Sequence, residues 1–325
     1  MAGNTLPEQL VKYLTDAHSI EEQALAQLEH APKLAGEPEL ARIFQEHLEE
    51  TRGHESRTRA RLEALDADPS RLKDAVMKAG GTGFLLFAKS QPDTPGKLVA
   101  HAYSYEHLEV AAYELLRRVA ERAGDRETAD LAQSICDEER AMGKRLESCF
   151  DRAADASLAD VGREDILEQL RKYLADAHAI EAQAVQLLEK APDLVSDPEL
   201  GRVFDEHLVE TRGHQELVDA RLDALGGEPS MLKDLALRAG ALNWGGFFGA
   251  HPDTPGKLVA FAYAFEHLEI GGYEQLRHVA EEAGDQETAG VAKRILGEER
   301  AAAEKLAASF DRAVEASLEA LGVTA

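Results

Sequence analysis

The chain has 325 residues, 44% of them apolar and 30% charged, which is the composition of a globular protein with room for two domains. Acidic residues outnumber basic ones by 61 to 36, and the resulting net charge of −25 argues against nucleic acid or an anionic membrane surface as a partner. Neither a disulfide framework nor a thiolate metal site fits the two cysteines, Cys136 and Cys149, because the second half of the chain replaces both.

The chain is built from one unit that occurs twice. Residues 8–158 align without a gap with residues 168–318, and a little over half of the aligned positions are identical. We therefore predict two domains, 1–160 and 161–325, that meet in a linker around 159–167.

Each unit is predicted to form four long helices, because apolar residues recur at helical spacing and no strand pattern is present. In chain order the helical segments are 7–30, 38–65, 94–123 and 126–153, with their equivalents in the second unit. Pro32 follows the first segment, Pro38 opens the second, and Gly124 ends the third. A long connection at 66–96, with a short predicted helix at 72–80, joins the second and third helices. The sequence thus predicts an all-α fold of two tandem ferritin-like four-helix bundles, each with a long helix-containing crossover.

Glutamate interrupts the apolar face of each predicted long helix, near its middle. In chain order the interrupting residues are Glu21, Glu50 with His54, Glu106 with Glu109, and Glu139. A buried carboxylate is costly, and several that face one another repel unless they are protonated or bridged by cations. Divalent metal resolves this conflict, and oxygen ligands with imidazole suit iron or manganese, with zinc as a further option.

The second copy helps to separate candidate ligands from neighbouring surface residues. Glu21 is retained while Glu22 becomes alanine, and Glu50 is retained while Glu49 becomes valine. Because ligands should persist and surface residues can drift, this comparison favours Glu21 and Glu50 as the ligands.

On the fourth helix the second copy retains both Glu138 and Glu139, and only the apolar spacing favours Glu139. The predicted metal ligands of the first unit are Glu21, Glu50, His54, Glu106, Glu109 and Glu139. Those of the second unit are Glu181, Glu210, His214, Glu266, Glu269 and Glu299. His18, His47 and His107 are also retained, and we interpret them as residues near the site or at the surface rather than as ligands.

Four motifs occur in a fixed order: Tyr-Leu-Thr-Asp-Ala at 13–17 with Glu21, His-Leu-Glu-Glu-Thr-Arg-Gly-His at 47–54, Glu-His-Leu-Glu-Val-Ala-Ala-Tyr at 106–113, and Glu-Glu at 138–139. They resemble those of the YciE/YciF-type ferritin-like metal-binding proteins, within the ferritin/rubrerythrin superfamily, and the resemblance covers nearly all of both units. It implies two metal ions per bundle in a carboxylate site, with iron as the favoured metal and manganese or zinc as alternatives. It also implies that the two repeats pack as an intramolecular pseudo-dimer.

Two departures from the superfamily pattern bear on the site. Glu50 and His54 form Glu-x-x-x-His instead of Glu-x-x-His, and Met142 and Ala302 occupy the position of a second histidine on the fourth helix. Each site is thereby expected to have five glutamates and one histidine. Rubrerythrin's cysteine-rich electron-transfer domain is absent, so a peroxidase of this kind would need an external reductant.

Three functions are compatible with these residues. The first is redox chemistry of the metal centre with oxygen or peroxide as possible substrates, of the ferroxidase or peroxidase kind and in a stress context, with no catalytic residue assigned. The second is non-catalytic metal binding or storage, and the third is a helical scaffold with structural carboxylates. The first residues have no signal-like character and no apolar run is long enough to span a bilayer, so we expect a cytoplasmic protein without membrane partners.

Overall fold

The computed structural model describes residues 5–67, 94–227 and 254–323, and it divides into two compact units. The first unit extends to Ala159 and the second comprises Asp160–Leu321. All regular secondary structure in these residues is helical, so the predicted all-α class is confirmed. The short helix predicted at 72–80 and most of the predicted crossover lie outside the described residues.

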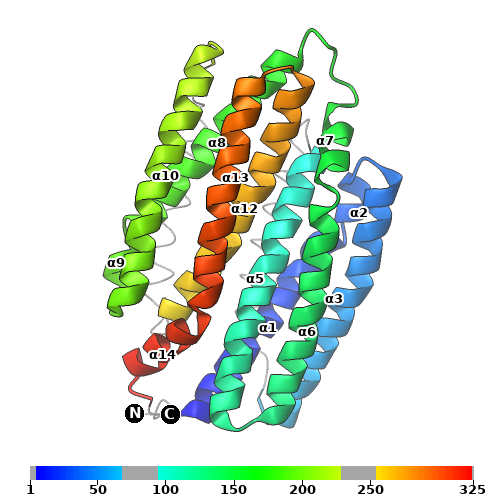
Figure 1. Cartoon of the computed structure of the whole chain (residues 1–325). Helices are drawn as coiled ribbons and strands as arrows, with labels where there is room; N and C mark the ends of the chain where they lie inside the picture. The colour runs from blue at the N-terminus through cyan, green and yellow to red at the C-terminus, as the bar shows by residue number, and fades with distance from the viewer. Residues whose placement is uncertain (1–4, 68–93, 228–253, 324–325) are drawn as a thin grey trace. The chain divides into compact units, whose positions relative to one another are not determined.

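The first unit is a four-helix bundle with two short additional helices. In chain order the helices are α1 (Leu6–Leu28), α2 (Ala31–Leu34), α3 (Pro38–Ala64), α5 (Thr94–Ala123), α6 (Arg126–Glu147) and α7 (Phe150–Leu158). α1 packs mainly against α3 and α5, and α6 packs mainly against α5 and α3 (Figure 1). The consecutive long helices α3 and α5 therefore occupy opposite corners of the bundle, as in ferritin-like folds with one long crossover.

The second unit repeats this arrangement. Its helices are α8 (Ile166–Leu188), α9 (Ala191–Leu194), α10 (Pro198–Ala224), α12 (Thr254–Glu282), α13 (Gln286–Ala308) and α14 (Phe310–Ala320). α8 packs against α10 and α12, and α13 packs against α12 and α10. The core uses equivalent side chains in the two units, since Phe44 and Phe204 are both buried, as are Leu116 and Leu276.

Capping residues set the helix boundaries. At the start of α1, Glu8 donates its backbone N–H to the Thr5 hydroxyl, and its carboxylate accepts the Thr5 N–H at 2.8 Å. Gly124 ends α5 with a φ of +73°, in the left-handed region that glycine enters without strain. Asp125 then begins α6 by accepting the backbone N–H of Thr128.

The long helix predicted at 126–153 is interrupted in the structure. α6 ends at Glu147 and α7 begins at Phe150. The Oγ of Ser148 donates to the carbonyl three residues earlier at 2.6 Å. The ring of Phe150 packs edge-on against Tyr103 of α5, with ring centroids 5.1 Å apart. This packing turns the chain so that α7 lies against α5, and no helix-breaking residue marks the turn in the sequence.

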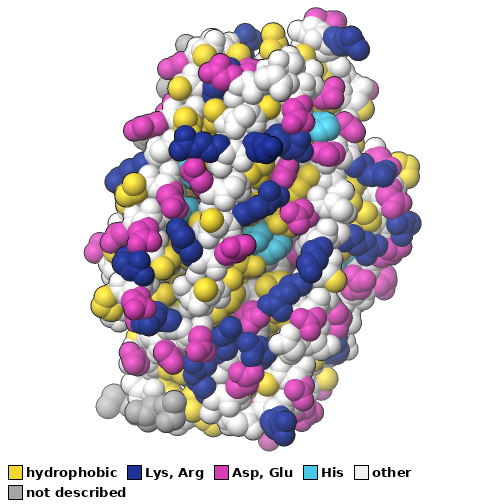
Figure 2. Space-filling view, viewed as in Figure 1, with side chains coloured by type: hydrophobic (Ala, Val, Ile, Leu, Met, Phe, Trp, Pro, Cys, Tyr) yellow, Lys and Arg dark blue, Asp and Glu magenta, His cyan; other side chains and the backbone are white. Residues whose placement is uncertain are grey.

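Charged side chains of both signs are interspersed over the described residues of the face shown in Figure 2. Many form pairs along a single helix, as Arg42 does with Glu39 and Glu46. Exposed pairs of this kind contribute little stability, so the fold depends on the buried interior.

Candidate metal centre

Six buried polar residues meet inside the first bundle, and we call them the first-unit cluster. They are Glu21 of α1, His47 and His54 of α3, Glu106 and Glu109 of α5, and Glu139 of α6. Each is at most 2% exposed. Spacings of three residues on α5 and seven on α3 place these side chains on the inward faces of their helices.

Two overlapping groups of ligand-type atoms make up this cluster. In one group, Nδ1 of His54 lies 2.5 Å from Oε1 of Glu139 and 3.8 Å from Oε2 of Glu21. The other joins His47, the two α5 glutamates and Glu139, with Nε2 of His47 2.9 Å from Oε1 of Glu106. Within each group, one ligand atom of every member lies within 4.8 Å of the others. Glu139 belongs to both groups and so joins them.

The carboxylate of Glu109 shows most clearly that a cation fits this cluster. Both of its oxygens are buried, and neither accepts a hydrogen bond from any residue that the structure describes. A buried carboxylate without a partner costs several kcal/mol unless it is protonated or neutralised. Carboxylate oxygens with imidazole nitrogens are ligands that suit iron, manganese or zinc. The residues present therefore fit a metal centre.

The electrostatics of the metal-free cluster favour bound protons. Burial, followed by the Glu139 charge, raises the pKa of Glu21 to about 8, and burial raises the pKa of Glu106 to about 7. Burial raises the pKa of Glu109 well above its usual range, and neighbouring carboxylates raise it further. Burial alone would lower the pKa of His54, but nearby carboxylates, Glu139 foremost, raise it to about 9. A metal would have to displace these protons.

The second unit has an equivalent set, which we call the second-unit cluster. Its members are Glu181, His207, His214, Glu266, Glu269 and Glu299, all at most 5% exposed. Nε2 of His207 lies 2.9 Å from Oε2 of Glu266, and Nδ1 of His214 lies 2.8 Å from Oε1 of Glu299. Both oxygens of Glu269 are again buried without a hydrogen bond among the described residues.

The structure brings ten of the twelve predicted ligands into these clusters and leaves two outside. The two outside are Glu50 and Glu210, whose side chains are 50% and 37% exposed. On a helix of 3.6 residues per turn, Glu50 is rotated by about 60° from His47, whereas His54 is rotated by only about 20°. The inward direction on α3 is therefore shared by the two histidines.

His47 and His207 are the cluster members that the sequence analysis did not count as ligands. A signal for them was present, because His47 continues the apolar positions of α3 between Phe44 and Thr51, both of which are buried. The sequence analysis instead paired His54 with Glu50, whose side chain lies outside the cluster. Each cluster consequently has four glutamates and two histidines instead of the expected five and one.

Glu138 and Glu139 differ in position. Glu139 is fully buried inside the cluster, whereas the Glu138 side chain is 45% exposed. Oε2 of Glu138 lies 3.0 Å from Nε2 of His54. The same oxygen lies 2.8 Å from Nη2 of Arg57. Glu138 therefore binds the outer nitrogen of His54, while the inner nitrogen faces the cluster.

Other retained polar residues surround the clusters. Tyr113 donates its hydroxyl to Oε1 of Glu21 at 2.5 Å, and Tyr273 does the same for Glu181. His107 bonds the backbone carbonyl of Tyr103, outside the cluster. His18 belongs to α1, and its Nδ1 lies 3.3 Å from the hydroxyl of Thr58 in α3.

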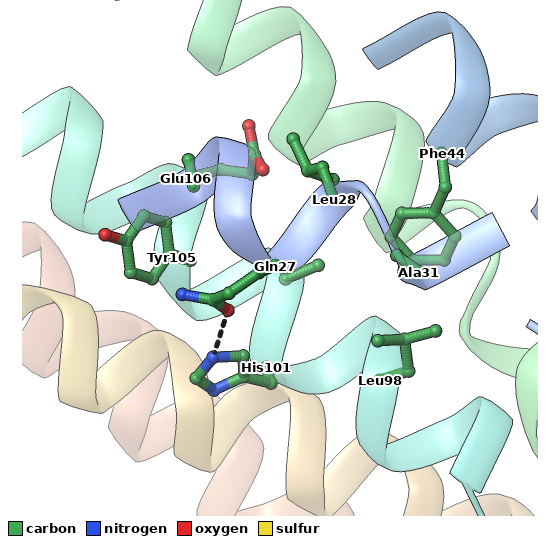
Figure 3. A pocket seen from close by; sticks show the side chains of 10 residues that line it. Gln27, Leu28, Ala31, Phe44, Leu98, His101, Tyr105 and Glu106 are labelled. Atoms are coloured by element: carbon green, nitrogen blue, oxygen red, sulfur yellow. Dashed lines mark hydrogen bonds between the residues drawn. The ribbon is translucent and has the colours of Figure 1, made fainter. Parts of the chain in front are cut away.

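A pocket adjoins the first-unit cluster at Glu106 and is otherwise lined by apolar side chains and one polar pair (Figure 3). In this pair, Nε2 of His101 lies 2.8 Å from Oε1 of Gln27. The second unit has Phe261 and Leu187 at these two positions, so its wall is apolar there.

The helical bundles and their buried clusters define a ferritin-like protein with sites compatible with metal binding. A family model described as "Domain of unknown function (DUF892)" matches residues 5–159 and again 165–319. The chain belongs to this family, with two tandem copies of its domain, and its resemblance to YciF-type proteins is confirmed.

The chain is similar to Protein YciF of Escherichia coli (strain K12), with 29% identity over 154 residues. The match covers 45% of this chain and 90% of that protein, a length comparable to one unit. No solved structure matches the chain. In the described residues, no helix combines the length and apolar character that crossing a membrane requires.

Proposed function

We propose that each unit binds two divalent metal ions in its cluster, that iron fits best, and that the centre reacts with dioxygen or peroxide. The observation that carries this proposal is the buried, unpartnered carboxylate of Glu109, which recurs as Glu269. Four glutamates and two histidines form the ligand composition of dinuclear carboxylate bundles. Here both histidines come from one helix, α3 or α10, rather than from two.

In the first unit, Glu21 and His54 would hold one ion, and His47 with the two α5 glutamates would hold the other. Glu139 would help to hold both ions, because it belongs to both groups of ligand atoms. When bound, a pair of iron ions would supply electrons for the reduction of dioxygen or peroxide.

The chain's own residues prepare the ligands for this role. Because the Tyr113 hydroxyl occupies Oε1 of Glu21, the buried Oε2 is left facing the cluster. The Glu138 carboxylate accepts a hydrogen bond from Nε2–H of His54, which leaves the Nδ1 lone pair for a metal. Burial of every ligand keeps bulk water away from the centre.

Oxygen uptake after anaerobic loading with Fe(II) tests this function. The wild-type chain should take up oxygen in proportion to the iron added, and the Glu109→Gln/Glu269→Gln chain should not, since it lacks one buried carboxylate in each cluster. Bound iron without oxygen uptake would leave a non-catalytic metal-binding protein, and failure to bind iron would leave a helical scaffold. Pairing of the two units, which the family resemblance implies, belongs to the same proposal, as do a stress-related role and a cytoplasmic location.

A further inference from the structure

The second unit is hollowed beside its cluster, between α10, α12 and α13. This pocket is small and half-enclosed, with about 240 Å³ of empty space when the region open to solvent at its mouth is included. His207 lies in its wall, together with Val203, Ala302 and Lys305. Because His207 is a member of the second-unit cluster, the pocket reaches from the surface to one residue of that cluster.

The side chain at position 302 is the main difference from the first unit. There the equivalent residue is Met142, which is buried and longer than Ala302 by its Cγ, Sδ and Cε atoms. A second substitution also reduces the side-chain volume in the second unit, because the partly exposed Val203 replaces the buried Ile43. Losing these atoms removes packing from the space between α10 and α13.

The exposure of the cluster histidines agrees with this difference. His207 is 5% exposed, whereas His47 is 1% exposed. At the mouth of the pocket, Nζ of Lys305 lies 3.3 Å from Oε1 of Glu210, and both side chains are more than a third exposed. An ion pair this exposed is weak and can separate at little cost. The mouth is therefore polar and easily opened, and the wall behind it is mostly apolar.

We propose that this pocket is the access route by which a small ligand of the metal, such as hydrogen peroxide, dioxygen or azide, reaches the second-unit centre. Met142 closes the equivalent route in the first unit. The proposal rests on the proposed function, because it assumes a metal at His207. The first unit has its own hollow on another side of its cluster, beside Glu106 (Figure 3). The hollows described in the two units thus lie on different sides of their clusters.

Azide binding to the oxidised iron centre, followed by stopped-flow absorbance in the full chain, tests this route. The second centre is observed alone in a Glu109→Gln/Glu139→Gln background, and the first alone in a Glu269→Gln/Glu299→Gln background. Ala302→Met should slow azide association with the second centre by about tenfold, corresponding to about 1.4 kcal/mol in the barrier. Met142→Ala should speed association with the first centre. Ala302→Ser, which hardly changes the side-chain volume, serves as the matched control and should leave the rate unchanged.

The outcomes separate this inference from the function on which it rests. Iron content is measured first, and a chain that binds no iron overturns the proposed function and the access route together. A chain that binds iron, but whose azide rate is unaffected by Ala302→Met, overturns only the route. Thermal unfolding of the metal-free chain adds an independent readout. Ala302→Met should leave the melting temperature unchanged or raise it if the hollow is real, and a fall of several degrees would show that there is no space to fill.

Discussion

At the scale of single residues, each cluster buries carboxyl and imidazole groups together, and burial and mutual contact change how they bind protons. In the first-unit cluster the pKa values of four residues are raised, namely those of Glu21, Glu106, Glu109 and His54. Each of these raised pKa values means that the group binds its proton more tightly in the folded cluster than in the unfolded chain. A group whose pKa is raised on folding stabilises the fold below its unfolded pKa, and this contribution is lost as the pH rises through the folded value.

The metal-free protein should therefore lose stability as the pH rises from about 4.5, the unfolded pKa of the glutamates, to about 9, the folded pKa of His54, and metal should suppress the loss by replacing the protons. Urea unfolding at a series of pH values, with and without bound metal, measures this. Glu109→Gln/Glu269→Gln should flatten the metal-free profile, because each substitution removes one titrating group. A metal-free stability that is constant or rising over this range would contradict the buried-proton account.

Glu138 is expected to act as a positioning residue for His54. Glu138→Gln should weaken metal binding by about 10- to 100-fold, since the carboxylate that fixes the imidazole tautomer is lost. Competition with a chelator of known affinity measures the change, in the Glu269→Gln/Glu299→Gln background so that only the first unit reports. Glu49→Gln, on the exposed side of α3, is the control. Equal affinities for the Glu138 and Glu49 variants would remove Glu138 from this role.

At the scale of helices, the apolar spacing and the capping residues of the sequence predicted the four long helices of each unit, because those patterns are local. The break after Glu147 was not predictable from the sequence, since the packing of Phe150 against Tyr103 produces it. Most residues of each cluster could be predicted from the sequence, because a glutamate is unusual on an apolar helix face. His47 was not predicted as a cluster member, because a histidine on such a face is ordinarily a core residue.

Arg61 ties the end of α3 to the turn between α5 and α6. Its guanidinium bonds both carboxylate oxygens of Asp125, and its Nε donates to the Thr128 hydroxyl at 2.7 Å. Arg61→Ala should lower the free energy of unfolding of the first unit by about 1–3 kcal/mol, because it removes charge-assisted hydrogen bonds to these partly buried acceptors. Urea unfolding measures the loss. Arg42→Ala, which removes only exposed ion pairs, should change little, and an equal effect of the two substitutions would contradict this account.

At the scale of the whole molecule, one family domain occurs twice, and each copy keeps its buried cluster of glutamates and histidines. Sequence alignment of the two halves predicted that repetition, because the equivalent positions are a constant distance apart. It did not predict how the halves differ around their clusters. The effects of Ala302 in place of Met142, and of Phe261 in place of His101, depend on which side chains surround them in three dimensions.

The metal content of three full-length chains tests the central claim most directly. Elemental analysis after anaerobic Fe(II) loading should find about four ions per wild-type chain, two in each bundle. Glu109→Gln/Glu269→Gln should lose most of this metal, and Glu50→Gln/Glu210→Gln should retain it, because the structure places only the former pair inside the clusters. Retention by the first variant with loss by the second, or no metal in the wild-type chain, would contradict the account.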